Sequence, residues 1–340
     1  MLRDLPPQRL LELYRRMLLI RRFEEELFHL TKAGHSFGHF HVYIGQETIG
    51  VPALGQLAPD DYVATTFRNH GHLLARGADP GRLLAEIMGK ATGYCKGKGG
   101  TLHATVKELG FLSTSASVGG VLPLATGAGF AAKQLGTRRV SVCCFGDGAM
   151  EEGAYFEAIN IAALWALPVI YLCENNSLGA PGTQAGEYAS STIAAARLTD
   201  LATAFQVPAV MVDGTDAAAV HRAMGEAVGR ARGGGPSFIE VQVRRWPGSR
   251  PLWPELLTGV TEVAMAWDPS RIRTDHADWH TTHDCVLRFT RELLAAGVAT
   301  REQVVELDAE VRAEMARASR FAVESPEPVP EGALADVFAP

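Results

Sequence analysis

The sequence predicts an α/β fold in which a doubly wound, mainly parallel sheet is preceded by a helix and followed by a helical extension. Between residues 119 and 243, apolar segments of strand length alternate with helical segments of ten or more residues. This alternation is typical of a parallel sheet covered by helices on both faces. The strand segments are also apolar almost throughout, as expected when both faces of a strand are buried.

Composition excludes several classes of protein. The chain has 340 residues, 47% of them hydrophobic and 21% charged, with a formal net charge of −6. This balance argues against a nucleic-acid binder, which needs a basic surplus to neutralise phosphates. No apolar stretch approaches the roughly 20 residues that span a bilayer, and the amino terminus lacks a signal-peptide core. We therefore expect a cytoplasmic protein that does not enter a membrane.

The cysteines indicate neither disulfides nor a zinc site. They number five, contain no CxxC pair, and lie partly inside apolar strand segments. An odd number without metal-site spacing favours free, buried thiols. They are Cys95, Cys143, Cys144, Cys173 and Cys285.

The first element is a long helix from Gln8 to about Ala33, within a helical arm spanning residues 1–35. Apolar residues recur there at helical spacing, while Arg22, Glu25 and other charged residues occupy the remaining faces. From residue 34 to residue 105 the chain is rich in Gly and His. Such a composition indicates loops around a site, interrupted by short strands and a helix near Pro80–Gly89.

Regular periodicity follows and sets the order of the sheet elements. A helix rich in small residues ends at Gln134. The remaining strands and helices are expected, in order, at Val140–Phe145, Met150–Trp165, Val169–Cys173, Ala194–Phe205, Ala209–Val212, Asp216–Arg232 and Ser237–Val243.

The last part of the chain is irregular and then helical. Residues 244–276 lose periodicity and gather Pro and Trp, which indicates a functional loop, here expected at the active site. Helices are predicted at Asp284–Ala296 and Arg301–Val323, the second capped by Thr300, within a carboxy-terminal region of helices and tail at residues 283–340. The whole chain, 1–340, is predicted to be one domain.

Two polar residues follow neighbouring strands of this predicted sheet. Asp147, flanked by Gly146 and Gly148, comes after one strand, and Asn176 comes after the next. With one crossover helix between the strands, both side chains should project from the carboxyl edge of the sheet. Gly-Asp-Gly alone is a common turn and Asn-Asn a common start of a loop. Their joint placement on adjacent strand ends favours a ligand site.

The chemistry of these residues fits Mg²⁺ with a diphosphate. Mg²⁺ takes six oxygens, with only one or two carboxylates among them. Asp147, the amide oxygen of Asn176 and the main-chain carbonyl of Leu178 would leave room for two diphosphate oxygens and a water. Gly146 and Gly148 allow close backbone approach to a ligand, and the helix opening at Ala149 offers N–H groups to anionic oxygen.

This spacing is the thiamine-diphosphate signature, and the chain resembles the alpha subunit of the decarboxylating component of 2-oxo acid dehydrogenase complexes of the pyruvate, branched-chain and acetoin types. The resemblance runs from about Tyr14 to Val243. Supporting segments, in the same order as in the family, are Leu18–Glu26, Tyr43–Glu47, Gly93–Gly100, Pro123–Gly127 and Phe156–Asn160.

The resemblance implies thiamine diphosphate and Mg²⁺ as cofactors and assigns roles to individual residues. Asp147, Asn176 and the Leu178 carbonyl would bind the metal, with Gly148 and Ala149 against the diphosphate. Arg68 matches the position that holds the diphosphate, a role that suits its forked, permanent charge. Val118 matches the residue whose backbone contacts the aminopyrimidine ring. His41 matches a histidine that faces the substrate and is the candidate catalytic residue of this chain.

Three positions depart from the family pattern. The family usually has Tyr where Phe67 stands and Gly where Ala116 stands, and both positions belong to the cofactor pocket. The active-site histidine of the late loop aligns with Gly248, which puts the normal acyl transfer in question. Other histidines nearby, His276, His280 and His283, are candidates to replace it.

The resemblance also implies a partner and a reaction. The glutamate that activates the cofactor belongs to a separate beta subunit in this family, so the chain is expected not to act alone but in a two-plus-two heterotetramer. The expected reaction is oxidative decarboxylation of a small 2-oxo acid with acyl transfer to a lipoyl carrier.

Two alternatives remain open on the sequence. One is a transketolase-like transfer from a ketose phosphate or 2-oxo acid to a non-lipoyl carrier protein, which the change at Gly248 would suit. The other is a non-catalytic scaffold subunit that keeps the fold while a partner acts.

Overall fold

The computed structural model describes residues 5–35, 40–176, 193–244, 246, 256, 259–273 and 277–335. Its centre is a sheet of six strands in the order β2-β1-β3-β4-β6-β5, and every neighbouring pair is parallel. The strands are β1 (Tyr62–Thr66), β2 (Phe111–Ser115), β3 (Ser141–Gly146), β4 (Val169–Asn175), β5 (Ala209–Asp213) and β6 (Ser237–Gln242). The predicted parallel sheet is confirmed.

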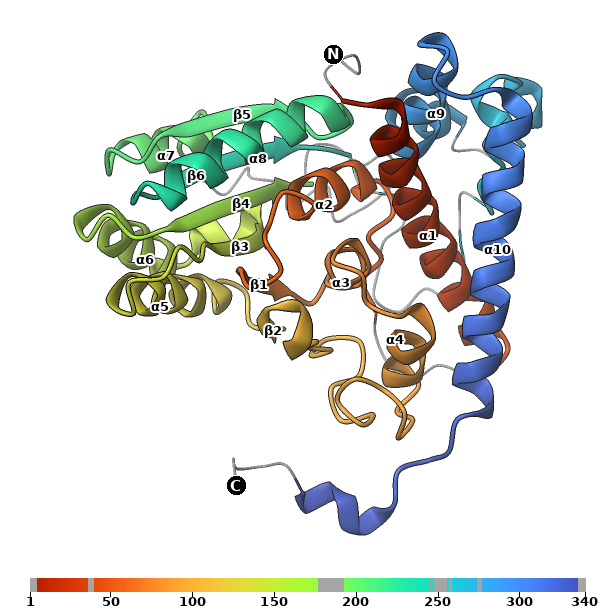
Figure 1. The fold of residues 1–340 in the computed structure, drawn as a ribbon, viewed down its shortest axis with the longest axis horizontal. Coiled ribbons are helices and arrows are strands. Elements are labelled where there is room, and N and C mark those ends of the chain that lie inside the picture. Colours follow the sequence, from red (N-terminus) through yellow and green to blue (C-terminus); the bar gives the residue numbers. More distant parts are fainter. Residues whose placement is uncertain are drawn as a thin grey trace.

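Helices cover both faces of the sheet (Figure 1). They are α1 (Pro7–Lys32), α2 (Glu47–Leu54), α3 (His70–Ala75), α4 (Pro80–Ile87), α5 (Val121–Gln134), α6 (Gly153–Leu164), α7 (Leu198–Thr203), α8 (Ala217–Arg232), α9 (Cys285–Ala295) and α10 (Arg301–Glu324). Figure 1 shows α1 and α10 side by side at one end of the molecule, where the two helices are in contact.

Successive residues of a strand pack into two separate hydrophobic cores, because side chains along a strand alternate between the two faces of the sheet. On β3, Val142 and Cys144 pack with α1, α2 and α8, whereas Cys143 and Phe145 pack with α5, α6 and α7. All four side chains are fully buried. This two-sided burial explains why the strands read as continuous apolar runs, and it confirms the doubly wound fold.

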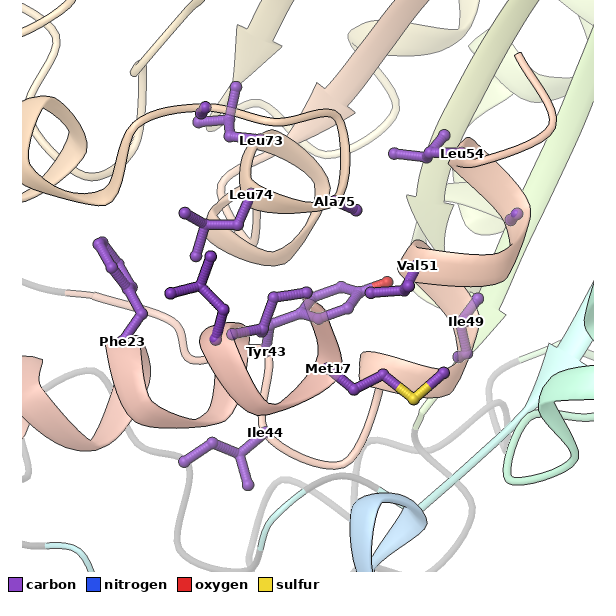
Figure 2. Close-up of a cluster of buried hydrophobic side chains, with 14 of the residues drawn as sticks. Met17, Phe23, Tyr43, Ile44, Ile49, Val51, Leu54, Leu73, Leu74 and Ala75 are labelled. Carbon is purple, nitrogen blue, oxygen red and sulfur yellow. The ribbon is translucent and has the colours of Figure 1, made fainter. Parts of the chain in front are cut away.

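The helix α1 carries buried charges as well as apolar residues. Met17 and Phe23 pack toward α2 and α3, and Figure 2 shows Tyr43 lying in the same cluster. Arg22 and Glu25, which the helical pattern places on other faces, are buried too. Arg22 bonds Glu25 at 2.6 Å and Asp308 of α10 at 2.7 Å. These ion pairs join the first long helix to the last one.

Element boundaries differ from the expectation at two helices. The segment expected to be helical from Met150 begins as a 3₁₀ turn, Asp147–Glu151, and α6 starts only at Gly153 because Glu152 is extended. The helix expected at Ala194–Phe205 is shorter, since Arg197 is extended and α7 begins after it. Between residues 244 and 276 the described part contains two short 3₁₀ turns, Val263–Ala266 and Pro269–Arg271.

The cysteines are free and mostly buried thiols, as the sequence predicts. All five cysteines are free, and each is buried except Cys95, which is half-buried. Burial raises the pKa of the Cys143 thiol above its usual range. In the described ranges, every helix is too short or too polar to cross a membrane.

Candidate functional site

The candidate site lies at the point where the sheet changes its direction of winding. From β1 the chain continues to β2 on one side, whereas from β3 it continues to β4 on the other. Connections that leave in opposite directions open a crevice beyond the carboxyl ends of the two strands, where ligands of open α/β sheets bind. The segment Thr66 to Arg68 leaves β1 at this crevice, and the segment Gly146 to Ala149 leaves β3.

A pocket of about 150 Å³ occupies this crevice. It brings together most of the residues that the sequence assigned to the cofactor. The lining residues are Thr66, Phe67, Arg68, Val118, Gly119, Gly146, Asp147, Gly148, Ala149, Glu174 and Asn176.

Asp147 and Asn176 meet in this pocket because their strands are adjacent and in register. Gly146 pairs with Glu174 across β3 and β4, so Asp147 stands one position beyond β3 and Asn176 one position beyond β4. Asp147 is 3% exposed and Asn176 is 8% exposed. The Nδ2 of Asn176 donates to the Oε1 of Gln46 at 2.5 Å. The amide oxygen of Asn176, at the other end of that group, therefore points away from Gln46.

Arg68 brings a buried positive charge to the same pocket. Its side chain is 6% exposed, and its Nη1 donates to the main-chain oxygen of Val42 at 2.5 Å. Next to it, the ring of Phe67 contacts the ring of His41 with 4.4 Å between centroids. His41 therefore touches a lining residue but is not itself among the lining residues, and its catalytic role stays a prediction.

A buried polar cluster supports the floor of the pocket. Glu174 accepts a short hydrogen bond from the hydroxyl of Tyr43, and its Oε1 lies 3.2 Å from Nε2 of His72. Burial alone would lower the pKa of His72, but Cys144 and the Glu174 carboxylate raise it to about 10. Burial and the same carboxylate raise the pKa of Tyr43 well above its usual range. The cluster fixes the end of β4 directly before Asn176.

Gln46 and the lining residues Thr66, Gly119 and Glu174 were not singled out from the sequence. Glu174 is a charged residue at the end of an otherwise apolar strand, directly before Asn175-Asn176. Gln46 lies in the segment Tyr43–Glu47, which was recognised only as part of the family resemblance. A polar residue inside a buried strand was the available signal for Glu174.

Several expected residues are elsewhere or outside the described part. Leu178, Gly248 and His276 lie outside the described residues. His280 is fully buried in the π-helical turn Trp279–His283 that precedes α9, with its Nδ1 3.2 Å from Oδ2 of Asp284. Neither His280 nor His283 lines the pocket.

The residues present fit a divalent cation with a diphosphate. Asp147 supplies one carboxylate, Asn176 an amide oxygen and Arg68 a cation, which is the donor set that a metal-bridged diphosphate requires. A methyl group built on Gly148 would meet no atom within 4 Å, so space is open beside the backbone of this turn. Among the described residues, no three His, Cys, Asp or Glu side chains form a metal cluster.

Comparison with known proteins identifies the family. Residues 15–250 match the family described as dehydrogenase E1 component. The chain is 38% identical over 340 residues to the alpha subunit of acetoin:2,6-dichlorophenolindophenol oxidoreductase of Cupriavidus necator, covering 98% of this chain and 95% of that one. The corresponding subunit of Bacillus subtilis is 37% identical, covering 98% and 95%. The pyruvate dehydrogenase E1 component subunit alpha of Zymomonas mobilis is 37% identical, covering 96% and 90%. The chain therefore belongs to the dehydrogenase E1 component family and is similar throughout to its alpha subunits.

Proposed function

We propose that the chain is the alpha subunit of a thiamine-diphosphate-dependent and Mg²⁺-dependent dehydrogenase that cleaves the bond beside the keto group of a small 2-oxo acid or of acetoin. The observation that carries this proposal is the convergence of Asp147, Asn176 and Arg68 on one pocket at the switch point of the sheet. Bound thiamine diphosphate supplies the carbon nucleophile and the electron sink for the cleavage.

The chain's own residues bind and orient the cofactor in this proposal. Asp147 and Asn176 hold Mg²⁺, together with the carbonyl of Leu178, and Arg68 binds the diphosphate. Val118 contacts the aminopyrimidine ring through its backbone, and His41 reaches the substrate past Phe67. The Glu174 cluster keeps the end of β4 rigid, so that the metal ligands are held in position before the cofactor arrives.

A separate beta subunit completes the site. The outer faces of α5 and α6 are unusually apolar: Leu124, Phe130, Phe156 and Trp165 are each exposed by at least 39%. Both helices begin next to the pocket, since α5 follows Val118 and Gly119 and α6 follows the Asp147–Glu151 turn. Exposed apolar patches of this kind mark protein interfaces. A partner seated here would also close the pocket, and we propose a two-plus-two assembly that passes its acyl product to a lipoyl carrier.

The substitution Asp147→Ala tests the cofactor site. The reconstituted alpha–beta complex should lose Mg²⁺-dependent binding of thiamine diphosphate in calorimetry and lose activity by about 100-fold or more, because a metal ligand is removed. Activity is measured as reduction of 2,6-dichlorophenolindophenol with pyruvate, branched-chain 2-oxo acids or acetoin as donor. The matched control is Asp60→Ala, which removes an exposed carboxylate.

Three results would contradict the proposal. Unchanged activity of the Asp147→Ala complex would favour the scaffold alternative. Full decarboxylation by the isolated chain, with tight stoichiometric binding of the cofactor, would show that no beta subunit is needed. Consumption of ketose phosphates in place of the three donors would favour the transketolase-like alternative.

A further inference from the structure

Gln46 is fully buried at the residue before α2, and its Oε1 accepts the hydrogen bond from Nδ2 of Asn176 at 2.5 Å. We infer that Gln46 is a positioning residue that fixes the orientation of the Asn176 amide, so that the amide oxygen and not the NH₂ group faces the cation. This inference rests on the proposed function, since it concerns the same metal site.

The orientation of Asn176 decides whether the residue can bind a metal at all. An amide side chain has an oxygen acceptor at one end and two N–H donors at the other. Rotated by half a turn, Asn176 would direct two partly positive hydrogens at the pocket. An acceptor next to Nδ2 prevents this rotation, because the rotated amide would place oxygen against oxygen. Gln46 supplies that acceptor from a segment 130 residues earlier in the chain.

Gln46 is itself held by a rigid turn. Its backbone N–H donates to the oxygen of Tyr43 at 3.0 Å, and the N–H of Gly45 donates to Oε2 of Glu47 at 2.8 Å. Glu47 in turn accepts from Nε of Arg21 on α1 at 2.7 Å, and both of these side chains are buried. A buried ion pair next to the turn leaves the Gln46 side chain little freedom to follow a rotation of Asn176.

The other end of Gln46 indicates what the amide is for. Its Nε2 is buried and has no hydrogen-bond partner among the described residues. A buried donor without an acceptor costs about 1 to 3 kcal/mol. A hydrocarbon side chain of similar size, such as Met, would avoid that cost. The presence of an amide here is explained by the need for its oxygen.

The test is binding of Mn²⁺, a paramagnetic substitute for Mg²⁺, to the alpha–beta complex in the presence of thiamine diphosphate, followed by electron paramagnetic resonance. Gln46→Met removes the acceptor, and we expect the dissociation constant for Mn²⁺ to rise about 10-fold or more, as for residues that orient metal ligands. Gln46→Glu keeps an acceptor and cannot donate when ionised, so it should restore binding to within about 3-fold of the original. Gln56→Met is the matched control, because Gln56 bonds His221 and does not line the pocket.

The inference is overturned if Gln46→Met binds Mn²⁺ like the unchanged complex, or if Gln46→Glu binds as weakly as Gln46→Met. If Gln46→Met does not fold, Gln46→Glu is sufficient as the test. Loss of Mn²⁺ binding in a folded Gln46→Glu variant would contradict the role of the acceptor. If the unchanged complex shows no Mn²⁺ binding that depends on Asp147, the proposed function has failed and this inference fails with it. If Asp147→Ala abolishes binding while Gln46→Met does not, only the inference is wrong.

Discussion

Asp284 stands at the centre of a buried group of charges that joins three helices. The carboxylate is fully buried and accepts from two nitrogens of Arg21, at 2.8 and 3.0 Å, and from the backbone of Val286 at 3.1 Å. Burial alone would raise the pKa of Asp284, but the charge of Arg21 and the hydrogen bond from His280 hold it well below its usual value near 3.8. The ionised form is therefore favoured by folding.

The substitution Asp284→Asn should make the stability of the protein less dependent on pH in acid. A carboxyl group whose pKa is lower in the folded state stabilises the fold above its unfolded pKa, and this contribution is lost as the pH falls below about 4. At pH 7 we expect the variant to lose about 3 kcal/mol, because Arg21 is left partly unpaired in the core. Urea denaturation at a series of pH values should show the difference from the unchanged protein narrowing progressively as the pH falls below about 4.

The exposed carboxylate of Asp200, which pairs with Arg197 at the surface, provides the control for this experiment. Asp200→Asn should change stability by less than about 1 kcal/mol, as surface ion pairs do. A constant difference between Asp284→Asn and the unchanged protein across the acid range would contradict the linkage.

For individual residues, the sequence predicts a role that follows from local position but does not predict one that depends on a partner distant in the sequence. Asp147 and Asn176 could be identified because each directly follows an apolar strand. Gln46 could not, since its importance comes from a hydrogen bond to a residue 130 positions away. From the helical pattern, Arg22 and Glu25 are also expected at the surface. Their burial is explained only by the contact of Arg22 with Asp308 of α10.

Among the elements, the long helices were predicted best. The capping box of α10 is present as expected: the hydroxyl of Thr300 accepts from the backbone of Gln303, and the Gln303 side chain accepts in return. The helix α2 was missed for a physical reason. All of its residues are buried, and it contains Pro52, so it shows neither an amphipathic pattern nor the usual helix composition.

A single buried carboxylate binds four backbone N–H groups of the glycine-rich loop after α4. Glu86 is fully buried, and it accepts from the backbone N–H groups of Cys95, Gly97, Gly99 and Gly100 at 2.7 to 3.2 Å. No periodic pattern could predict this arrangement, because the loop has no secondary structure of its own. A second anchor ties the loop to the residues that follow Arg68: Asn69 donates to the oxygen of Thr101 at 2.8 Å.

Glu86→Gln should loosen this loop without unfolding the protein. One end of the new amide is a donor and faces backbone donors, so about two of the four hydrogen bonds are lost, each worth roughly 1 kcal/mol. Hydrogen–deuterium exchange of a peptide covering residues 93–103 should accelerate by about 10-fold or more, while peptides from β3 and β4 keep their protection. Glu108→Gln, at an exposed side chain, is the control. Unchanged exchange in the loop would show that other contacts hold it.

For the molecule as a whole, the sequence predicted the parallel, doubly wound sheet but not the strand order. The strand order depends on the side of β1 on which the chain places β3 after it leaves β2, and no local sequence pattern encodes that choice. The switch point and its pocket follow from this order. The strand pattern alone predicted that Asp147 lies next to Asn176. That Arg68 belongs to the same site was predicted only from the family resemblance.

A charge on the apolar face of α5 and α6 should prevent assembly. Phe130 is 40% exposed, and its ring lies 5.4 Å from that of Trp165. Phe130→Asp should leave the isolated chain folded by circular dichroism, since the residue is at the surface, but it should abolish co-elution with the beta subunit in size-exclusion chromatography. Val329→Asp, at an exposed residue of the carboxy-terminal tail, should assemble normally. Normal assembly of Phe130→Asp would place the interface elsewhere.

The buried arginines of α1 also bear on how the polypeptide matures during translation. Arg21 and Arg22 leave the ribosome early and are soon followed by their partners Glu47 and Glu25, whereas Asp284 and Asp308, which also pair with them, are made much later. Seating α1 before Asp284 and Asp308 arrive would leave part of the donor capacity of both guanidinium groups unmet in the core, because Glu47 accepts only from Nε of Arg21 and Glu25 only from Nη1 of Arg22. The last hydrogen bonds of α1 therefore form only after roughly 270 further residues have been synthesised, which takes about 15 to 55 s at ordinary elongation rates. During that interval the exposed apolar surface of the nascent chain most needs the protection of a chaperone.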